Sequence, residues 1–214
     1  MHVAVNAAMS VDGKLASRDR EQLAISGPKD FARVERLRAA YDAIMVGVGT
    51  VLADDPSLTL DEPSAHGDAT HPIRIVADSR ARTPPDARVL DDATETYVLV
   101  SEAVPPEHVA SLERAGASIV ETGEHRVDLE TGLARLEAQG IDSLLVEGGG
   151  ELIFSLFEAD LVDELSVYVG SMVIGGRDAP TLADGRGFTE GYPQLTRQSV
   201  QKLGDGVVLE YTVD

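Results

Sequence analysis

Cysteine is absent from this sequence of 214 residues. That absence excludes disulfide bonds, thiolate catalysis and any zinc site with cysteine ligands. Long apolar segments are missing too: no uninterrupted run reaches membrane-spanning length, and Met1 leads into a strand-like segment without a basic and then apolar leader. We therefore expect a soluble, cytoplasmic protein.

Several catalytic spacings are also missing. The five histidines form no HxH or HExxH pattern, so we predict no metal site. No GxSxG elbow occurs, which leaves serine hydrolysis unsupported. No internal repeat is evident, so the chain is not a repeat array.

Basic residues are scarce. The chain has 18 Lys and Arg against 37 Asp and Glu, for a net charge of −19, and only three residues are lysine. Such a chain repels nucleic acid and anionic membranes. The acids are spread along the sequence and do not form one tail, which suits a salt-rich cytoplasm and predicts a halophile's surface. In such an acidic protein, a basic residue in a pocket is a candidate for binding an anion, and Arg38 is one such residue.

The hydrophobic content of 43% is enough for one core, and we predict a single domain over residues 1–214. Apolar runs of strand length alternate with segments of helical spacing until the end, where two strands read as a hairpin. This order predicts an α/β fold with a mostly parallel sheet and an antiparallel C-terminal edge. The expected strands cover 2–9, 43–48, 73–77, 96–101, 118–122, 144–146, 167–174, 197–203 and 207–213, and the expected helices begin at 28, 106, 129 and 151.

The segment around Gly148–Gly150 is the strongest candidate for a ligand site. It joins a buried strand to a helix through three glycines. Amides at a helix start are unpaired and favour anions, and residues without a Cβ let a phosphate approach. Glu147, at the carboxyl end of the strand, lies where α/β sheets place ligand-contacting groups. The alternative is a simple βα turn beside a solvated Glu147.

Two more predicted strands end in polar loops. A glycine, a hydroxyl and two carboxylates in 49–56 predict a loop at the carboxyl edge of the sheet, in which Asp54 or Asp55 either contacts a ligand or caps a short helix. Arg80 and Arg82 follow the next strand. They could hold a phosphate, such as the 2′-phosphate of NADPH, or be solvated.

Other segments carry weaker signals. Asp12-Gly13 reads as a turn, and residues 61–71 as a surface excursion. Gly175-Gly176 follows a strand and either holds part of a ligand or reverses the chain. In the helix that opens at Pro28, we expect the apolar residues Phe31, Val34 and Leu37 to face the sheet.

Several short segments resemble segments of the reductase family of riboflavin biosynthesis. They occur in the same order as in that family, and together they span almost the whole chain. The segments are 9–14 (MSVDGK), 49–59 (GTVLADDPSLT), 72–79 (PIRIVADS), 146–150 (VEGGG) and 161–165 (LVDEL). The resemblance implies a dihydrofolate-reductase-like three-layer α/β fold and a homodimer. It also implies NADPH-dependent reduction, with NADH as a second possibility, of a ribosylaminopyrimidine 5′-phosphate to its ribitylamino form.

Bifunctional bacterial relatives carry an amino-terminal zinc deaminase with cysteine ligands, which this sequence lacks. It therefore resembles the stand-alone archaeal and fungal type, which acts on 2,5-diamino-6-ribosylamino-4(3H)-pyrimidinone 5′-phosphate. Two alternatives stay open. One is an enzyme of the same fold with another substrate, such as dihydrofolate, and the other is a non-catalytic NADPH-binding sensor.

Matching positions in the family imply site roles. Substrate contacts fall on Arg38, Leu58 and Glu147, and the proton for the ring oxygen or product hydroxyl comes from Asp54, Glu147 or water. The implied cofactor contacts are Thr50, Asp54, Ser79, Gly148, Gly149, Gly150, Glu151 and Leu152.

Three positions depart from the family pattern. Ala24 stands where many bacterial relatives have a tryptophan against the cofactor, and Asp61 where some have an arginine for the phosphate. Ser171 replaces a proline that is frequent before the Gly175-Gly176 loop. The second departure leaves Arg38, and a group from a partner subunit, to hold the substrate phosphate.

Overall fold

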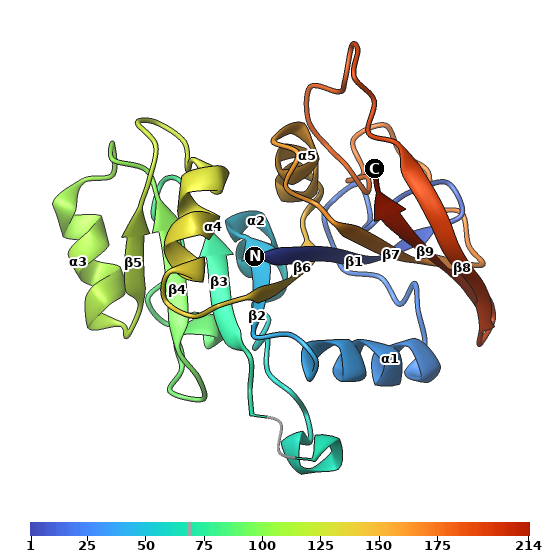
Figure 1. The fold of residues 1–214 in the computed structure, drawn as a ribbon, viewed down its shortest axis with the longest axis horizontal. Coiled ribbons are helices and arrows are strands. Elements are labelled where there is room, and N and C mark those ends of the chain that lie inside the picture. The colour runs from blue at the N-terminus through green and yellow to red at the C-terminus, as the bar shows by residue number, and fades with distance from the viewer. Residues whose placement is uncertain (68–69) are drawn as a thin grey trace. The chain divides into compact units, whose positions relative to one another are not determined.

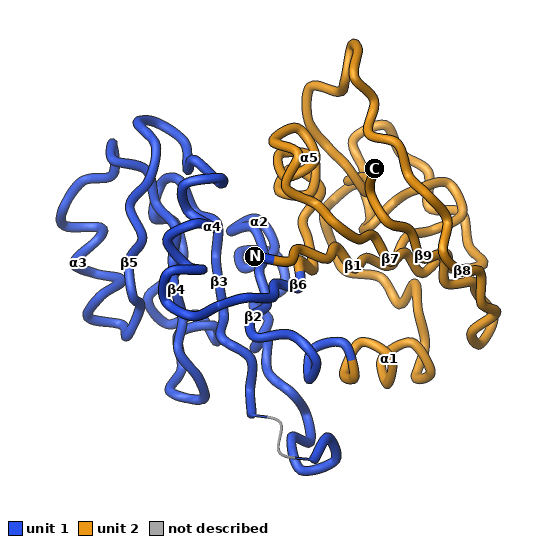
Figure 2. Tube along the Cα trace, viewed as in Figure 1, with its two compact units in different colours: residues 1, 37–145 blue, residues 2–36, 146–214 orange. Residues whose placement is uncertain are grey.

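The computed structural model describes residues 1–67 and 70–214, which form two compact units (Figure 2). Unit 1 consists of Met1 and residues 37–145, and unit 2 of residues 2–36 and 146–214. The predicted excursion at 61–71 falls partly outside the described residues. Its described part contains a short 3-10 helix, Pro63–His66.

Strands and helices alternate along the chain until two successive strands close it (Figure 1). The strands are β1 (His2–Ser10), β2 (Ala43–Gly47), β3 (Ile73–Ala77), β4 (Thr96–Val100), β5 (Ser118–Glu121), β6 (Ser143–Gly148), β7 (Glu164–Gly170), β8 (Leu195–Leu203) and β9 (Gly206–Val213). The α-helices are α1 (Pro28–Arg38), α2 (Val48–Asp54), α3 (Pro106–Arg114), α4 (Leu129–Glu137) and α5 (Gly150–Glu158), and a second 3-10 helix is Arg88–Leu90.

In the described residues the strand order is β5-β4-β3-β2-β6-β1-β7-β9-β8. The first four belong to unit 1, the last four to unit 2, and β6 is divided between them. In unit 1, β2, β3, β4 and β5 pair in parallel. In unit 2, β1 and β7 are parallel, whereas β9 pairs antiparallel with both β7 and β8. The predicted mostly parallel sheet with an antiparallel C-terminal hairpin is confirmed.

Two predicted boundaries were wrong. The segment after β2 was expected to be a loop, but α2 begins at once, because Val48 and Val51 lie three residues apart and are both buried. The expected strand 167–174 is instead Glu164–Gly170. It ends at Gly170, where a Cβ would lie 2.5 Å from the carbonyl oxygen of Ile25, so the backbone of another segment occupies the space beside the strand.

The prediction for α1 was wrong at one of its three apolar residues, Phe31. Phe31 is 57% exposed, Val34 and Leu37 are half-buried, and the buried residues of the helix are Asp30 and Arg33. Val34 and Leu37 lie on the same side of the helix as Asp30 and Arg33, so the apolar pattern failed only at Phe31.

The polar side chains of the adjoining strands explain why two charged residues of α1 are buried. The Arg33 guanidinium donates to Asp30 Oδ1 at 2.8 Å, to Ser166 Oγ of β7 at 2.9 Å and to Asn6 Oδ1 of β1 at 2.8 Å. Buried polar groups are costly unless they are hydrogen-bonded. Arg33 satisfies Asn6 in the interior, and Asp30 neutralises the arginine.

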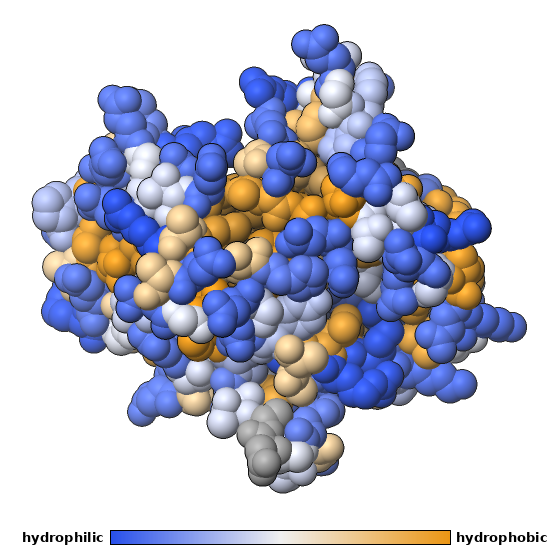
Figure 3. Space-filling model, viewed as in Figure 1, coloured by the Kyte–Doolittle hydropathy of each residue, from blue (hydrophilic) through white to orange (hydrophobic). Residues whose placement is uncertain are grey.

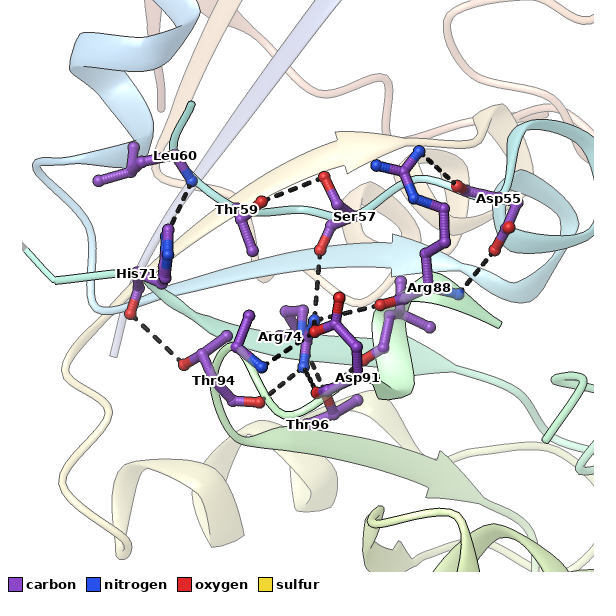
Figure 4. A network of polar contacts seen from close by, with 12 residues as sticks. Asp55, Ser57, Thr59, Leu60, His71, Arg74, Arg88, Asp91, Thr94 and Thr96 are labelled. Atoms are coloured by element: carbon purple, nitrogen blue, oxygen red, sulfur yellow. Dashed lines mark hydrogen bonds and ion pairs between the residues drawn. The ribbon is translucent and has the colours of Figure 1, made fainter. Parts of the chain in front are cut away.

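Arg74, on β3, is the largest fully buried side chain of the described residues. Its Nε donates to Thr96 Oγ1 at 2.9 Å and its Nη1 to Asp91 Oδ1 at 2.7 Å (Figure 4). The ion pair and hydrogen bond from Arg74 hold the pKa of Asp91 below its usual range. Further acceptors of the same guanidinium are the carbonyl oxygens of Ser57, Arg88, Asp91 and Thr94. One cation thus holds two loops of unit 1 against the sheet.

Hydrophilic side chains predominate on the face shown in Figure 3, in keeping with the net charge of −19. In the described part of the chain, no helix combines the length and apolarity needed to cross a membrane.

We predict that Arg74→Leu lowers the free energy of unfolding by about 3–5 kcal/mol, because it leaves several buried acceptors without a donor. Urea unfolding at constant high salt measures the change. Arg114→Leu is the control, since exposed Arg114 donates to Ala110 of its own helix, and it should cost less than about 1 kcal/mol. Equal losses in the two variants would contradict the role assigned to Arg74.

Candidate functional site

Thr50 and Asp54 lie on α2, immediately after the carboxyl end of β2 in unit 1. Their spacing of four residues places both side chains on the same face of the helix. Asp54 is the last residue of α2, and partial burial of its carboxyl group raises its pKa. Asp55 caps the helix in a left-handed conformation, with φ 40°. Of the two carboxylates, Asp54 and Asp55, for which a helix-capping role was considered, Asp55 is the residue that caps α2, at its C-terminal end.

Ser79 follows the carboxyl end of β3. Its Oγ accepts a hydrogen bond from the Val127 amide at 3.0 Å, and its carbonyl oxygen accepts one from Ser101 Oγ at 2.7 Å. Ser101 follows the neighbouring strand β4. Because β2, β3 and β4 are parallel, Thr50, Ser79 and Ser101 line the same edge of unit 1.

Both arginines after β3 are exposed, in keeping with the alternative of solvated charge, but Arg82 also lies near a buried carboxylate. The Arg82 Nε lies 3.6 Å from Asp78 Oδ1, and Asp78 is fully buried. The other carboxylate oxygen accepts from the amide and the hydroxyl of Thr83. This loop is thus built around an interior carboxylate. Arg80 has no hydrogen bond or ion pair among the described residues.

Arg38 and Leu58, the substrate candidates of unit 1, lie close together. Arg38 is the last residue of α1, and its Nη1 donates to the carbonyl oxygen of Thr59 at 3.0 Å. Leu58 has φ 53° and is only 2% exposed. Because its side chain is buried in the core, only its main-chain groups could contact a ligand.

The glycine loop of unit 2 has the predicted strand-to-helix geometry. Glu147 and Gly148 end β6, Gly149 is the N-cap residue, and Gly150 begins α5. Gly148 has φ 131°, which favours glycine, and the Gly148–Gly149 peptide is cis. The amides of Leu152 and Ile153 donate to the Gly149 carbonyl oxygen. The first-turn amides of α5 before them form the anion-binding end of the helix.

Packing within the chain is a further reason for the lack of a side chain at Gly150. A Cβ there would lie 2.3 Å from the carbonyl oxygen of Thr181 and 3.1 Å from the amide nitrogen of Asp184, whose amide donates to the Gly150 carbonyl oxygen. Gly150 therefore makes room for the chain's own 181–184 segment. That segment supports the helix start from which Glu151 and Leu152 extend.

The Asp12-Gly13 turn has a second function. Gly13 has the expected positive φ, 79°, and the Asp12 carboxylate accepts from Ser10 Oγ and from the amides of Ile174 and Gly175, the last at 2.8 Å. These bonds, Ser10 first, lower the pKa of Asp12 to about 2. The sequence predicted a turn but not this tether on the Gly175-Gly176 loop.

An open hollow of about 580 Å³ lies in unit 2, between residues 17–23 and the tethered loop. Arg18, Leu23 and Val173 are among its lining residues, together with Gly175 and Gly176. Its size is in the range of small-molecule sites. The glycine loop at 175–176 thus borders a concave surface.

The structure brings the candidate residues together in two groups. Unit 1 holds Arg38, Thr50, Asp54, Leu58 and Ser79, and unit 2 holds Glu147, Gly148, Gly149, Gly150, Glu151 and Leu152. Sequence reasoning missed the supporting roles of Asp78, Ser101 and Asp12. A buried polar residue directly after a strand is the signal that could have found the first two.

The three departures from the family pattern are all exposed: Ala24, Asp61 and Ser171. The Ser171 hydroxyl donates to the carbonyl oxygen of Asp205, so it fixes the start of the 171–176 loop to the β8–β9 turn. Within residues 1–67 and 70–214, no group of three or more His, Asp or Glu side chains could hold a metal ion.

Comparison with known proteins identifies close relatives. A family model described as the RibD C-terminal domain matches residues 1–209. The 2,5-diamino-6-ribosylamino-4(3H)-pyrimidinone 5′-phosphate reductase of Methanothermobacter thermautotrophicus is 47% identical over 99% of this chain and 98% of its own length. The protein of the same name from Archaeoglobus fulgidus is 44% identical over 96% and 94%.

Solved structures confirm the fold. RibD from Acinetobacter baumannii superposes with a TM-score of 0.83 at 24% identity, over 100% of this chain and 58% of that chain. The riboflavin biosynthesis reductase Rib7 of Saccharomyces cerevisia superposes with a TM-score of 0.71 at 21% identity, over 100% and 90%.

We predict that Asp12→Asn releases the 174–175 loop, because a neutral amide is a weaker acceptor than a carboxylate. Hydrogen exchange at the Ile174 and Gly175 amides should become roughly tenfold faster at neutral pH. Since the pKa of Asp12 is lowered from 3.8 to about 2, the wild-type tether is complete above 3.8 and is lost as the pH falls through about 2. Asp86→Asn removes the same charge elsewhere and should leave both amides unchanged.

Gly150→Ala is expected to destabilise the protein by about 1–3 kcal/mol, because its Cβ would overlap the backbone at Thr181. Gly27→Ala is the matched control, since a Cβ at Gly27 meets no atom within 4 Å, and it should change stability by less than about 0.5 kcal/mol. Thermal unfolding of the two variants gives the comparison. An unaffected Gly150→Ala variant would show that residues 181–184 do not constrain the loop.

Proposed function

The chain belongs to the RibD C-terminal domain family, and we propose that it is the reductase that converts 2,5-diamino-6-ribosylamino-4(3H)-pyrimidinone 5′-phosphate to its ribitylamino product in riboflavin biosynthesis. The observation that carries this conclusion is 47% identity to an archaeal reductase of that name across 98% of the relative's length. The chain is therefore an oxidoreductase, and we propose one reductase domain over residues 1–214.

The proposed cofactor is NADPH, with NADH as the second choice. When bound, a reduced nicotinamide would supply the hydride that reduces C1′ of the ring-opened substrate. Thr50 and Asp54 on one face of α2, and Ser79 beside them, would hold the cofactor in unit 1. In unit 2 the first-turn amides of Gly150 and Glu151, next to Gly148, Gly149 and Leu152, suit its diphosphate. The donors present fit such a group, because they combine main-chain amides with hydroxyls.

Arg38, Leu58 and Glu147 are the proposed substrate residues. The bond from Arg38 to Thr59 orients the guanidinium beside the Leu58 segment, and forked N–H donors match a phosphate. Glu147 can accept hydrogen bonds from ribose hydroxyls or pyrimidine amino groups.

Hydride transfer needs no protein nucleophile, so these residues act by positioning and electrostatics. A proton must also reach the ring oxygen or the product hydroxyl. Asp54 and Glu147 are the proposed donors, and the raised pKa of Asp54 keeps its acid form populated to higher pH than that of a free aspartate.

We further propose a cytoplasmic homodimer with a halophile's surface. The net charge of −19 disfavours nucleic acid and anionic membranes as partners, and high salt screens the repulsion between acidic copies.

The direct test is incubation of the protein at high salt with NADPH and the pyrimidinone phosphate. Loss of NADPH absorbance that depends on this substrate supports the proposal. Oxidation with dihydrofolate instead would identify a different reductase, and NADPH binding without oxidation by either compound would identify a sensor.

Two variants test the allocation of residues. Arg38→Ala should raise the KM for the pyrimidinone phosphate about 100-fold, through loss of a charge-assisted pair, and Glu147→Gln about tenfold. Neither should change NADPH affinity more than about twofold. The reverse control is Thr50→Val, which should weaken NADPH and spare the substrate. A variant at Arg38 or Glu147 that weakens only NADPH would show that its role is assigned wrongly.

A further inference from the structure

The segment 179–188, between β7 and β8 in unit 2, lies along α5 (Figure 1). It contacts the helix at Gly150, Phe154 and Glu158. These residues are four positions apart, so they share one face of α5. The segment therefore supports the helix from its first residue to its last. We call it the α5 brace.

Close packing fixes the middle and the end of the α5 brace against the helix. The ring centroids of Phe154 and Phe188 lie 5.0 Å apart, at an interplanar angle of 48°, which is a favourable arrangement for an aromatic pair. Gly185 has φ 149°, and a Cβ at this position would overlap the Phe154 ring, so glycine is what lets the chain pass this close to α5. At the end of the helix, Arg186 Nε donates to Glu158 Oε1 at 2.8 Å.

The turn after β1 holds the start of the α5 brace from the other side. The Ala179 carbonyl oxygen accepts a hydrogen bond from Lys14 Nζ at 3.0 Å, and Thr181 forms an antiparallel bridge with Lys14. Ala179 is only 2% exposed. Thr181, which lies against Gly150, is therefore fixed between this turn and α5.

Asp184 closes the turn of the brace that touches the first residue of α5. Its Oδ1 accepts hydrogen bonds from the Thr181 amide, at 3.1 Å, and from the Thr181 hydroxyl. The Asp184 amide donates to the Gly150 carbonyl oxygen at 3.0 Å. That carbonyl belongs to the same peptide group as the amide of Glu151. Because a peptide group is planar, a bond that fixes the carbonyl oxygen also fixes the direction of the N–H group.

We infer that Asp184 is a positioning residue for the cofactor, because it directs the Glu151 amide toward the diphosphate through the peptide group that begins at Gly150. The inference rests on the proposed function, which places the diphosphate at the first turn of α5. A donor that is already oriented loses less entropy when the ligand binds. The charge of Asp184 has the opposite effect, since a carboxylate near the diphosphate repels it. The two effects differ in sign, so substitutions at this position separate them.

Two substitutions at Asp184 remove the same charge but not the same hydrogen bonds. Asp184→Ala removes the acceptor of both Thr181 bonds, and the Kd of NADPH, measured by fluorescence titration at constant high salt, should rise about tenfold. Asp184→Asn keeps one side-chain oxygen, which is enough because both bonds end on Oδ1. Its Kd should stay within about threefold of the wild-type value or fall below it. Tighter binding of NADPH by both variants would show a purely electrostatic effect and overturn the inference.

Kinetic measurements and a control separate positioning from a loss of stability. In the Asp184→Ala variant, kcat at saturating NADPH and the KM for the pyrimidinone phosphate should change by less than about twofold, because only cofactor binding is altered. Asp178→Ala is the control, since Asp178 is exposed, and it should leave the Kd of NADPH within about twofold. A lower unfolding temperature of Asp184→Ala with an unchanged Kd would show a merely structural role and overturn the inference.

Hydrogen exchange tests the positioning without the cofactor. The amides of Leu152 and Ile153 donate to the Gly149 carbonyl oxygen in the first turn of α5. In Asp184→Ala they should exchange at least about fivefold faster than in the wild type or in Asp184→Asn. Equal rates in all three proteins would overturn the inference.

A second variant covers the case in which Asp184→Ala does not fold. Thr181→Val removes one of the two donors to Asp184 and should raise the Kd of NADPH about threefold, and an unchanged Kd would overturn the inference. Failure of the wild type to bind NADPH would refute the proposed cofactor together with this inference. Unchanged NADPH binding by Asp184→Ala would refute this inference alone.

Discussion

A buried guanidinium organises the part of unit 1 that carries the candidate residues. Arg74 has no exposure to solvent and donates to side chains and carbonyl oxygens from the segments before β3 and between β3 and β4. A charge in this position must be fully hydrogen-bonded, because desolvation without partners costs several kcal/mol. The loops therefore have few alternatives to their observed paths. The segment that contains Leu58 and receives the Arg38 bond is one of them.

Unit 2 holds its loops in a related way, with carboxylates and main-chain groups. The Asp12 carboxylate binds the amides of Ile174 and Gly175, and the Asp184 amide donates to the Gly150 carbonyl oxygen. Arg33 links α1 to Asn6 and Ser166. These contacts join residues far apart in the sequence. They give the glycine segments defined positions that their own flexibility would not provide, and such preorganisation is what positioning catalysis requires.

The elements were predictable where local patterning and tertiary packing agree. Strands such as β3, with its continuous apolar run, and helices such as α3 and α4 were found close to their true bounds. The two failures, at α2 and at Phe31, both come from contacts with residues outside the local segment. α2 was missed because Gly49, Thr50, Asp54 and Asp55 look like a loop, whereas buried Val48 and Val51 decide the matter. Phe31 was assigned to the core by its spacing, although the sheet beneath α1 presents Asn6 and Ser166 and selects Arg33. Neither cause is local.

By itself the sequence determined the α/β class, the strand-to-helix turn at Gly148–Gly150 and the family, because these follow from periodicity, glycine chemistry and the order of short segments. Membership is now supported by the match over residues 1–209. Only the tertiary structure decided which side chains are buried, that Gly150 yields space to Thr181 and that Asp12 tethers Gly175. These depend on contacts between distant residues, through steric exclusion at Gly150 and hydrogen bonding at Asp12 and Arg33, and no local pattern specifies such contacts.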